Sequence, residues 1–346
     1  MSTINLALQT STLEHILFLG FLGFAVSMLV TPIYTTIAYK RQWWKKPRTT
    51  TVSGEQATEF QKLHAAKHLR NIPTMAGLIM VFGVAVVTLT LNLSREQTWL
   101  PLAAMVGAGA VGFIDDLINI KGSGTGIAGL RSKIKLLLIS GVALVGGSWF
   151  FVKNGIDSFH VPGTGSVIIG WLIIPLFVLV VVSTANAVNI SDGLDGLAGG
   201  LLASAFGVYA VISLLQQRYG VAAFCMTIVG SLLAYVWFNI FPARFFMGDI
   251  GSFALGTALG VVAMITDTVF LLPIIGLVFV GETGSVIIQN ISKKLRHGKK
   301  IFRISPIHHH FEAIGWPEAK VTMRFWIIGQ VCAVLGLLLA ILGGFV

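Results

Sequence analysis

Residues 170–200, "GWLIIPLFVLVVVSTANAVNISDGLDGLAGG", join an apolar run to a short turn that carries two aspartates, after which a second apolar run begins. Residues 170–185 contain no charge, and the predicted span over 166–189 is long enough to cross a hydrocarbon core about 30 Å thick. Asn189, Asp192 and Asp195 stand where the chain leaves this run. The pattern predicts two membrane-spanning helices joined by a tight polar turn.

The whole chain has the composition of a membrane protein. Of its 346 residues 55% are hydrophobic and 11% are charged, whereas soluble domains carry about a quarter charged residues. This composition excludes a water-soluble fold and predicts an all-α, polytopic transmembrane bundle of about ten helices, forming one domain over residues 1–346. The predicted spans are 14–36, 73–93, 99–116, 133–152, 166–189, 194–215, 221–240, 248–266, 269–291 and 322–345.

The positive charges are divided unequally between the two sides of this bundle. With ten crossings, 21 of the 24 Lys and Arg fall on one side, in the loops 37–72, 117–135, 241–247 and 292–324. The other side has Arg95, Lys153 and Arg218. The positive-inside rule assigns the basic side to the cytoplasm and both termini to the outside. The net charge of +10 therefore reflects topology, and we expect no nucleic-acid partner.

Several acidic residues converge on the predicted cytoplasmic face. Asp115 and Asp116 end the third span, Asp192 and Asp195 occupy the turn after the fifth, and Asp249 opens the eighth. An aspartate at a helix start can simply cap free N–H groups. Paired carboxylates at a C-terminal helix end, however, repel each other unless a cation neutralises them. Because ionisable groups at membrane depth are usually functional, we favour a shared cation site.

The kind of ligand indicates which cation and which substrate this site takes. Carboxylate and amide oxygens suit a hard ion such as Mg²⁺ or Mn²⁺, and Mg²⁺ is commonly held by one or two carboxylates together with substrate phosphates. In a helix, Asp192 and Asp195 would share one face, and Gly193 would let a ligand approach the backbone. These features predict a phosphate ester or diphosphate as substrate.

Basic and histidine side chains lie on the same predicted face. The basic candidates are Lys67, Arg131, Lys133 and Lys135, each of which could instead extend to lipid headgroups. Three consecutive histidines, His308, His309 and His310, make a poor zinc site because adjacent side chains point in different directions. We expect them to donate hydrogen bonds to a phosphate or a sugar.

Four stretches carry a resemblance to a known family. They are "GFIDD" (112–116), "NAVNISDGLDGLAGG" (186–200), "FNIFPARFFMGDIGSFALG" (238–256) and "FRISPIHHHFEAIGWPEAKVTMRFW" (302–326). Together they resemble the signatures of the phospho-N-acetylmuramoyl-pentapeptide-transferases, a branch of the polyprenyl-phosphate N-acetylhexosamine-1-phosphate transferases. The first two and "MGDIGS" are shared by the wider superfamily, whereas "PIHHHFE" points to the muramoyl-pentapeptide branch.

The resemblance implies a reaction and its setting. UDP-N-acetylmuramoyl-pentapeptide and undecaprenyl phosphate would give undecaprenyl-diphospho-N-acetylmuramoyl-pentapeptide (lipid I) and UMP, in the first membrane step of peptidoglycan synthesis. It further implies ten transmembrane helices, an Mg²⁺ site facing the cytoplasm, a location in the bacterial inner membrane among its lipids, and a homodimer.

The resemblance also implies roles for individual residues. Asp115 and Asp116 are the carboxylates at the reacting centre, Asp249 is the Mg²⁺ ligand, and His308, His309 and His310 face the diphosphate and sugar. The substrate-binding residues it implies are Asn189, Asp192 and Asp195 along the nucleotide, Gly193, Leu194 and Phe246 near the uracil, Asn239 near the centre, Gln289 near the histidines, Thr74 and Lys67 at the rim, and Lys121, Arg131 and Lys133 as further basic contacts.

The chain departs from the family pattern in two places. Two extra residues separate Lys67 from Pro73, so either Lys67 or Arg70 takes the place of the family's lysine. After the paired acids, Asn119 and Ser123 stand where the family is richer in Lys and Arg, so Lys121, Arg131 and Lys133 would carry part of that charge.

Alternative chemistries and functions remain open at this stage. Asp115 or Asp116 could orient or deprotonate the lipid phosphate, or form a covalent aspartyl-phosphate. A sister transferase would use another UDP-N-acetylhexosamine, such as N-acetylglucosamine, and the "HHHFE" stretch argues against it. An ion-coupled transporter would place its ionisable groups near the bilayer midplane, and a scaffold without chemistry would need none of these acids.

Overall fold

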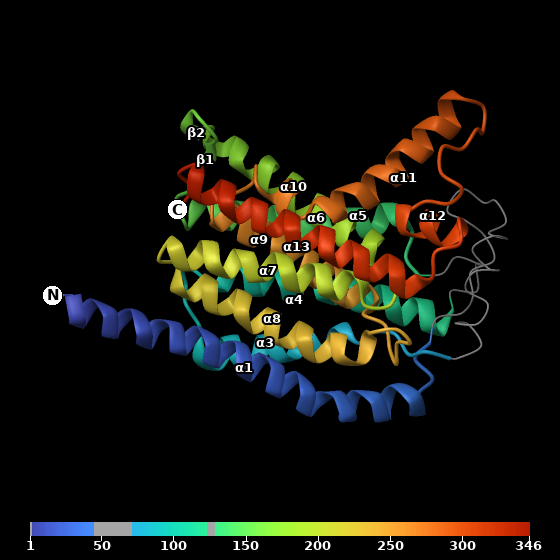
Figure 1. Ribbon diagram of the computed structural model, residues 1–346, viewed down its shortest axis with the longest axis horizontal. Helices are drawn as coiled ribbons and strands as arrows, with labels where there is room; N and C mark the ends of the chain where they lie inside the picture. Colours follow the sequence, from blue (N-terminus) through green and yellow to red (C-terminus); the bar gives the residue numbers. More distant parts are fainter. Residues whose placement is uncertain (1, 45–70, 123–128) are drawn as a thin grey trace.

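The computed structural model describes residues 2–44, 71–122 and 129–346. Within them ten long helices run side by side in one bundle (Figure 1). These helices are α1 (Ser2–Lys40), α3 (Gly77–Leu91), α4 (Trp99–Lys121), α5 (Ser132–Val152), α6 (Ile173–Ser191), α7 (Leu197–Leu215), α8 (Tyr219–Asn239), α9 (Gly248–Ile265), α11 (Leu277–Leu295) and α13 (Glu318–Leu342). The prediction of an all-α, polytopic membrane bundle is confirmed.

The ten helices differ in how well they suit a membrane. Eight of those in the described residues have the length and mean hydropathy that a crossing requires. The others are α3, which is apolar but has 15 residues, and α11, which carries Lys293 and Lys294 in its last turn. Short elements complete the fold: α10 (Leu272–Ile275), α12 (Ile307–Ala313), the 3-10 turn Gly170–Leu172, and the strands β1 (Ser158–Val161) and β2 (Gly165–Ile168).

Helix α9 forms the centre of the bundle. All of its 18 residues are buried, and it packs against α3, α4, α6 and α7. Small residues make this close packing possible, because lipid offers no hydrophobic force between helices and tight van der Waals contact must replace it. At Gly256, for example, an added Cβ would lie 2.7 Å from Ala185 Cα of α6. The sequence "GDIGSFALGTALG" thus suits a helix surrounded by other helices on every side.

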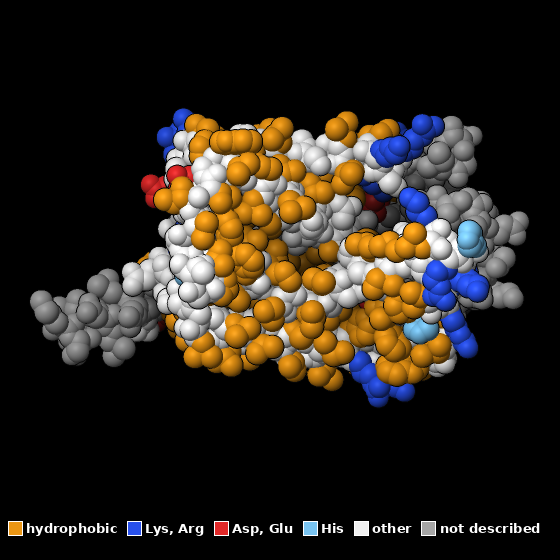
Figure 2. Space-filling model, turned by 90° about the horizontal axis from the view of Figure 1, so that it is seen from above, with side chains coloured by type: hydrophobic (Ala, Val, Ile, Leu, Met, Phe, Trp, Pro, Cys, Tyr) orange, Lys and Arg blue, Asp and Glu red, His pale blue; other side chains and the backbone are white. Residues whose placement is uncertain are grey.

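The outer helices expose their apolar side chains. Leu29 of α1, Leu137 of α5, Trp237 of α8 and Leu342 of α13 are each 72–74% exposed. Hydrophobic side chains accordingly cover the middle of the molecule in Figure 2, while Lys and Arg side chains gather mainly at the end of the bundle where α12 lies. An apolar belt with a charged end is the surface expected of a protein that sits in lipid.

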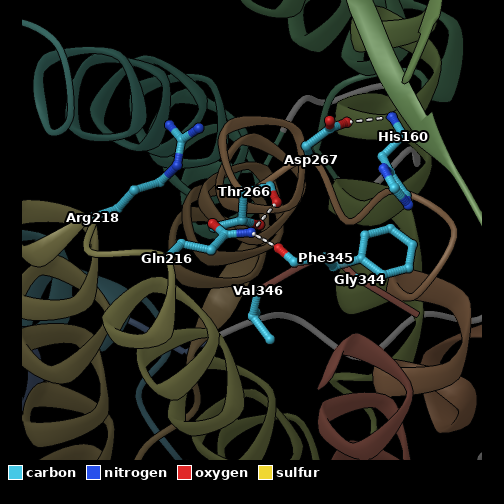
Figure 3. Close-up of a pocket in the computed structure, with 8 residues that line it drawn as sticks. All are labelled: His160, Gln216, Arg218, Thr266, Asp267, Gly344, Phe345 and Val346. Carbon is cyan, nitrogen blue, oxygen red and sulfur yellow. Dashed lines mark hydrogen bonds between the residues drawn. The ribbon is translucent and has the colours of Figure 1, made fainter. Parts of the chain in front are cut away.

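Both termini lie at the other end of the bundle, and the C-terminus lies beside the β1–β2 hairpin (Figure 1). That end holds a cavity of about 360 Å³ lined by residues that tie the chain together (Figure 3). Gln216 Nε2 donates to the carbonyls of Thr266 and Phe345, and Asp267 accepts a 2.8 Å hydrogen bond from the His160 backbone N–H. Burial raises the pKa of the Asp267 carboxyl above its ordinary value.

Four predicted boundaries were wrong by five residues or more. The first helix begins at Ser2 and not at residue 14. The span expected from residue 166 begins as α6 at Ile173, because residues 165–168 form β2 and pair with β1. Short runs of β-branched residues suit a strand as well as a helix, so their periodicity did not distinguish the two. The third span continues to Lys121 instead of ending at 116, and the ninth begins as α11 at Leu277 after the separate turn α10.

Candidate active site

Three aspartates from two distant parts of the chain meet where the last part of α4 lies beside the first turn of α9. Asp115 and Asp116 lie on α4, and Asp249 is the second residue of α9. One carboxylate oxygen from each lies within 4.8 Å of the others, and all three residues are buried. Because α4 runs on to Lys121, the paired acids lie more than a turn inside the helix and not at its tip as predicted.

Two glycines allow α4 and α9 to approach this closely. A Cβ on Gly112, one turn before Asp116, would collide with the backbone carbonyl of Asp249. Gly248 has φ +75, and a Cβ there would collide with Asp116 Oδ2. Only glycine satisfies both the left-handed backbone and the lack of space. The "GFIDD" and "MGDIGS" stretches therefore pack in direct contact, because each has a glycine at the point where the other approaches.

Backbone amides and one lysine hold the acids in place. Asp115 Oδ1 accepts a 2.5 Å hydrogen bond from the Leu130 N–H, and Asp116 Oδ2 accepts one of 3.2 Å from the Ile250 N–H. Lys135 Nζ lies 2.7 Å from Asp115 Oδ2 and 2.7 Å from Asp249 Oδ2. The carboxylates are thus neutralised in part by a positive charge that the chain itself supplies.

Of the other predicted basic contacts, those within the described residues form no ion pair with the acid cluster. Arg131 and Lys133, on the same segment as Lys135, are exposed, and so is Lys121 at the end of α4. Lys67 and its alternative Arg70 lie outside the described residues. The sequence predicted basic contacts from this segment but did not indicate that Lys135 makes them. The direction in which each side chain points from the helix was not known from the sequence.

The acid cluster has the donor set of a hard divalent ion. Three buried carboxylates without sulfur or imidazole ligands fit Mg²⁺ or Mn²⁺.

Thr74 was predicted at the rim but is buried, and its hydroxyl lies beside Gly248, where an added Cβ would be 2.9 Å from Thr74 Oγ1. A recess that shows acidic atoms opens near this end of the molecule (Figure 2).

The turn between α6 and α7 is held by hydrogen bonds and is not helical. Asp192 is the C-cap of α6, so the prediction that Asp192 and Asp195 share a helical face is wrong. Asp195 is buried, and its Oδ2 accepts a 2.9 Å hydrogen bond from the Ala243 N–H. Asn239 accepts from the Gly196 N–H and donates to the Phe245 carbonyl. The turn is thereby fixed to the loop that leads into Asp249.

Helix α13 clamps the same turn from the other side. Glu318 accepts a 2.7 Å hydrogen bond from the Asp195 N–H, Thr322 donates to the Asp195 carbonyl, and Trp326 donates to the Gly196 carbonyl. Leu194, predicted near the uracil, is 4% exposed and belongs to the main hydrophobic core. Most of this turn is therefore fixed by protein, whereas Gly193 and Asp192 are half-buried.

Contacts continue from the acid cluster towards the histidines. Asn189 Nδ2 donates a 2.9 Å hydrogen bond to Ser252 Oγ, one turn beyond Asp249. Gly193 faces His308 so closely that a Cβ there would collide with His308 Nε2. The structure thus brings together the "SDGLDG" turn and the three-histidine stretch at Gly193, which has no side chain.

Each histidine has a different partner. His308 Nδ1 lies 2.8 Å from Glu282 Oε2 of α11, with both side chains fully buried. His309 Nδ1 lies 2.7 Å from Glu312 Oε2, and burial lowers the pKa of His309 to about 4, so the ring is neutral near pH 7 and donates to Glu312. His310 Nδ1 accepts a hydrogen bond of 3.2 Å from the Arg303 N–H.

Gln289 and Phe246 shape the loops around the site. Gln289 donates to the Phe302 carbonyl and accepts from the N–H groups of Ile301 and Phe302, so it fixes the chain that leads to the histidines. The Phe246 backbone pairs with Pro73 and Ala76, and its side chain is half-buried. The polar groups of Gln289 and the backbone of Phe246 are thus used in contacts within the protein itself.

Sequence reasoning assigned no contact to four residues that support the site: Lys135, Glu282, Glu312 and Glu318. A partner for Glu282 could have been expected, because this residue interrupts the apolar run "IIGLVFVGETGSVII", and a buried charge at membrane depth needs a partner. Glu318 could not, since its contact with the Asp195 backbone depends on where α13 docks.

We expect Gly248→Ala to disrupt the acid cluster. The left-handed backbone would cost about 1–2 kcal/mol with a side chain, and the added Cβ would push against the Asp116 carboxylate. Transfer activity should fall sharply while Gly207→Ala, at a helical glycine of α7 with open space around it, remains close to wild type. Equal activities of the two variants would contradict this account of Gly248.

We expect Asp195→Ala to lower stability more than it lowers affinity for a nucleotide. The change leaves the buried Ala243 N–H without its acceptor, at a cost of about 1–3 kcal/mol. Thermal unfolding of the detergent-solubilised protein should shift down, and further than for Asp192→Ala, whose side chain is half-buried. An Asp195 variant with unchanged thermal stability and weakened UDP binding would show a direct nucleotide contact instead.

Comparison with known proteins first defines the class. Residues 98–267, which contain all three clustered aspartates, match the family model described as Glycosyl transferase family 4. The chain is 38% identical over 334 residues to the phospho-N-acetylmuramoyl-pentapeptide-transferase of Geobacillus sp. (strain WCH70), covering 94% of this chain and 98% of the relative. It is 38% identical over 329 residues to that of Bacillus mycoides (strain KBAB4), covering 92% and 96%.

The phospho-N-acetylmuramoyl-pentapeptide-transferase of Chloroflexus aurantiacus (strain ATCC 29366 / DSM 635 / J-10-fl) is 40% identical to the chain over 285 residues, which is 79% of this chain and 78% of that protein. Identity at this level over nearly the whole length establishes the family. The chain belongs to the phospho-N-acetylmuramoyl-pentapeptide-transferases.

Proposed function

We propose that the protein transfers phospho-N-acetylmuramoyl-pentapeptide from UDP-N-acetylmuramoyl-pentapeptide to undecaprenyl phosphate, producing lipid I and UMP. The observation that carries this proposal is the meeting of Asp115, Asp116 and Asp249 within 4.8 Å in a chain of this family. Transfer between a water-soluble nucleotide and a lipid requires a reacting centre at the membrane surface. Contacts of Asn189 with Ser252 and of Gly193 with His308 link these acids to α12, at the end of the bundle where Lys and Arg gather (Figure 2).

The residues of the site suit phosphoryl transfer. This chemistry requires positioning and neutralisation of charge more than covalent catalysis by the protein. When bound, Mg²⁺ supplies the neutralisation of the diphosphate and of the departing UMP, and Asp115, Asp116 and Asp249 would hold it. Asp115 or Asp116 orients the acceptor phosphate, and the backbone N–H groups of Leu130 and Ile250 fix those carboxylates for the purpose.

The nucleotide and sugar would lie against one continuous surface of the site. Asn189, Asp192 and Gly193 form one part of it, and the His308 ring, in direct contact with Gly193, continues it. The Glu282 carboxylate fixes Nδ1 of His308, so that Nε2 faces the half-buried turn along which a phosphate or sugar oxygen would bind. Helix N-terminal amides at the start of α9 add a further attraction for the diphosphate.

We propose the bacterial inner membrane as the location, with the acid cluster facing the cytoplasm and a homodimer as the assembly. The gathering of Lys and Arg at the end where α12 lies supports this orientation through the positive-inside rule. Labelling of single cysteines introduced beside α12 in inverted membrane vesicles tests the orientation. Cross-linking in native membranes tests the dimer.

Incubation of the purified protein with both substrates and Mg²⁺ tests the reaction itself. We expect UMP and a lipid-linked pentapeptide product, lost on addition of a chelator and restored by excess Mg²⁺. Offering UDP-N-acetylglucosamine in the same assay tests the sister reaction. Product from that nucleotide alone would overturn the proposed substrate, and turnover undiminished by the chelator would overturn the metal.

A further inference from the structure

Lys135 of α5 stands between the two helices that carry the acids. Its Nζ lies 2.7 Å from Asp115 Oδ2 on α4 and 2.7 Å from Asp249 Oδ2 on α9. Both contacts are ion pairs, and the one with Asp249 also has the geometry of a hydrogen bond. One ammonium group therefore joins the two helices at the place where their carboxylates meet.

The position of this ammonium conflicts with that of a divalent ion. Asp115 and Asp249 belong to the set whose oxygens lie within 4.8 Å of one another, and Mg²⁺ sits about 2.0–2.1 Å from its oxygen ligands. A nitrogen 2.7 Å from one oxygen of each carboxylate takes up nearly the point that an ion bridging them would occupy. Because like charges repel strongly in a buried site, the two cations compete for these oxygens.

Helical phase explains why Lys135 alone of its segment reaches the acids. Lys133 lies two residues earlier on the same helix, and residues two apart on a helix face different directions. Lys133 is exposed, whereas the Lys135 side chain is 17% exposed. The contact is thus a property of one position and not of the basic segment in general.

We propose that Lys135 is a positioning residue. Its ammonium group holds the acid cluster in place before the metal arrives, and it releases the carboxylate oxygens of Asp115 and Asp249 when the metal binds. This inference rests on the proposed function, since it takes the acid cluster as the metal site. The flexible four-carbon stem of a lysine permits the movement. A diphosphate that arrives with the ion offers the displaced ammonium new oxygen partners.

Two consequences follow for binding. Competition from Lys135 weakens the binding of metal to the protein alone. The diphosphate relieves that competition, so metal and diphosphate each strengthen the binding of the other, as linkage requires. The arrangement discourages occupation of the site by metal when no nucleotide is present.

The test measures Mn²⁺ binding to the full chain in detergent, without substrates, by isothermal titration calorimetry. Lys135→Met should bind Mn²⁺ more tightly than wild type by roughly tenfold, within the ordinary range of coupling between sites. Lys135→Arg keeps the charge and should stay near wild type. Lys153→Met removes a lysine from the opposite end of α5 and should also leave the affinity unchanged.

Repeating the titration with UDP supplies the second readout. UDP should tighten Mn²⁺ binding several-fold more in wild type than in Lys135→Met. A Lys135→Met variant that binds Mn²⁺ no more tightly than wild type would overturn the inference, and so would equal effects of UDP in both proteins.

Asp249→Asn separates failure of the inference from failure of the proposed site. Loss of Mn²⁺ binding in Asp249→Asn, with unchanged binding in Lys135→Met, would overturn the role of Lys135 alone. Wild-type Mn²⁺ binding in Asp249→Asn would show that the metal site lies elsewhere, and the inference would fall with it.

Discussion

Replacing Asp249 by asparagine should reduce lipid I formation on the order of 10³-fold, the scale on which loss of one preorganised electrostatic contact slows an enzyme. Asp249 contributes the carboxylate of α9 to the acid cluster, and its amide analogue has the same shape without the charge. The loss should appear in kcat, measured as UMP released from UDP-N-acetylmuramoyl-pentapeptide at saturating Mg²⁺.

A matched control comes from the other end of the same helix. Asp267 follows α9 and accepts a hydrogen bond from the His160 backbone, far from the acid cluster. Asp267→Asn keeps an acceptor at that position and should leave turnover within a few-fold of wild type. Near wild-type turnover in Asp249→Asn would refute its assignment as the metal ligand, and equal losses in both variants would point to damage to the helix.

Replacing His308 by alanine should reduce turnover by about 10²-fold, at the lower end of what a positioned proton donor contributes. The His308 ring lies between Glu282 and Gly193, and its Nε2 is the atom that faces the proposed nucleotide side. Glu282→Gln should cost about tenfold, because it loosens the orientation of that ring without removing it.

The double variant distinguishes the two roles. If Glu282 acts only through His308, the pair of changes should slow turnover no more than His308→Ala alone, since residues that act as a unit are not additive. Steady-state kinetics of wild type, both single variants and the double variant measure this. Fully additive losses would contradict the proposal that Glu282 positions His308.

Much of the fold could be predicted from the sequence because lipid restricts the options. Long uncharged runs in a membrane protein can only be helices or barrel strands, so each predicted span found a helix. The prediction failed at residues 165–168, where "GSVI" outside the helix forms β2, and at residue 121, where "LINIK" continues α4 past Asp116. Local composition does not decide such boundaries, since tertiary packing does.

The site was predictable in its residue types and less so in its contacts. The acids were recognised because charge at membrane depth is costly, and Asp115, Asp116 and Asp249 do meet. Asp195 and Asn239 were expected to face substrate, yet both bind the protein's own backbone. A polar side chain near a site can bind the ligand directly, or it can hydrogen-bond the backbone of a loop whose other residues bind the ligand. The spacing of residues in the sequence is the same in both cases.

The enclosure of α9 by its neighbours has a consequence for how the enzyme responds to its lipids. None of the 18 residues of this helix is open to acyl chains, so a thicker or thinner bilayer acts on the rim helices first. The surrounding helices therefore adjust to the bilayer thickness, and the position of Asp249 at the start of α9 changes little. With the acceptor lipid held constant, we expect nanodiscs of short- and long-chain lipids to support similar rates.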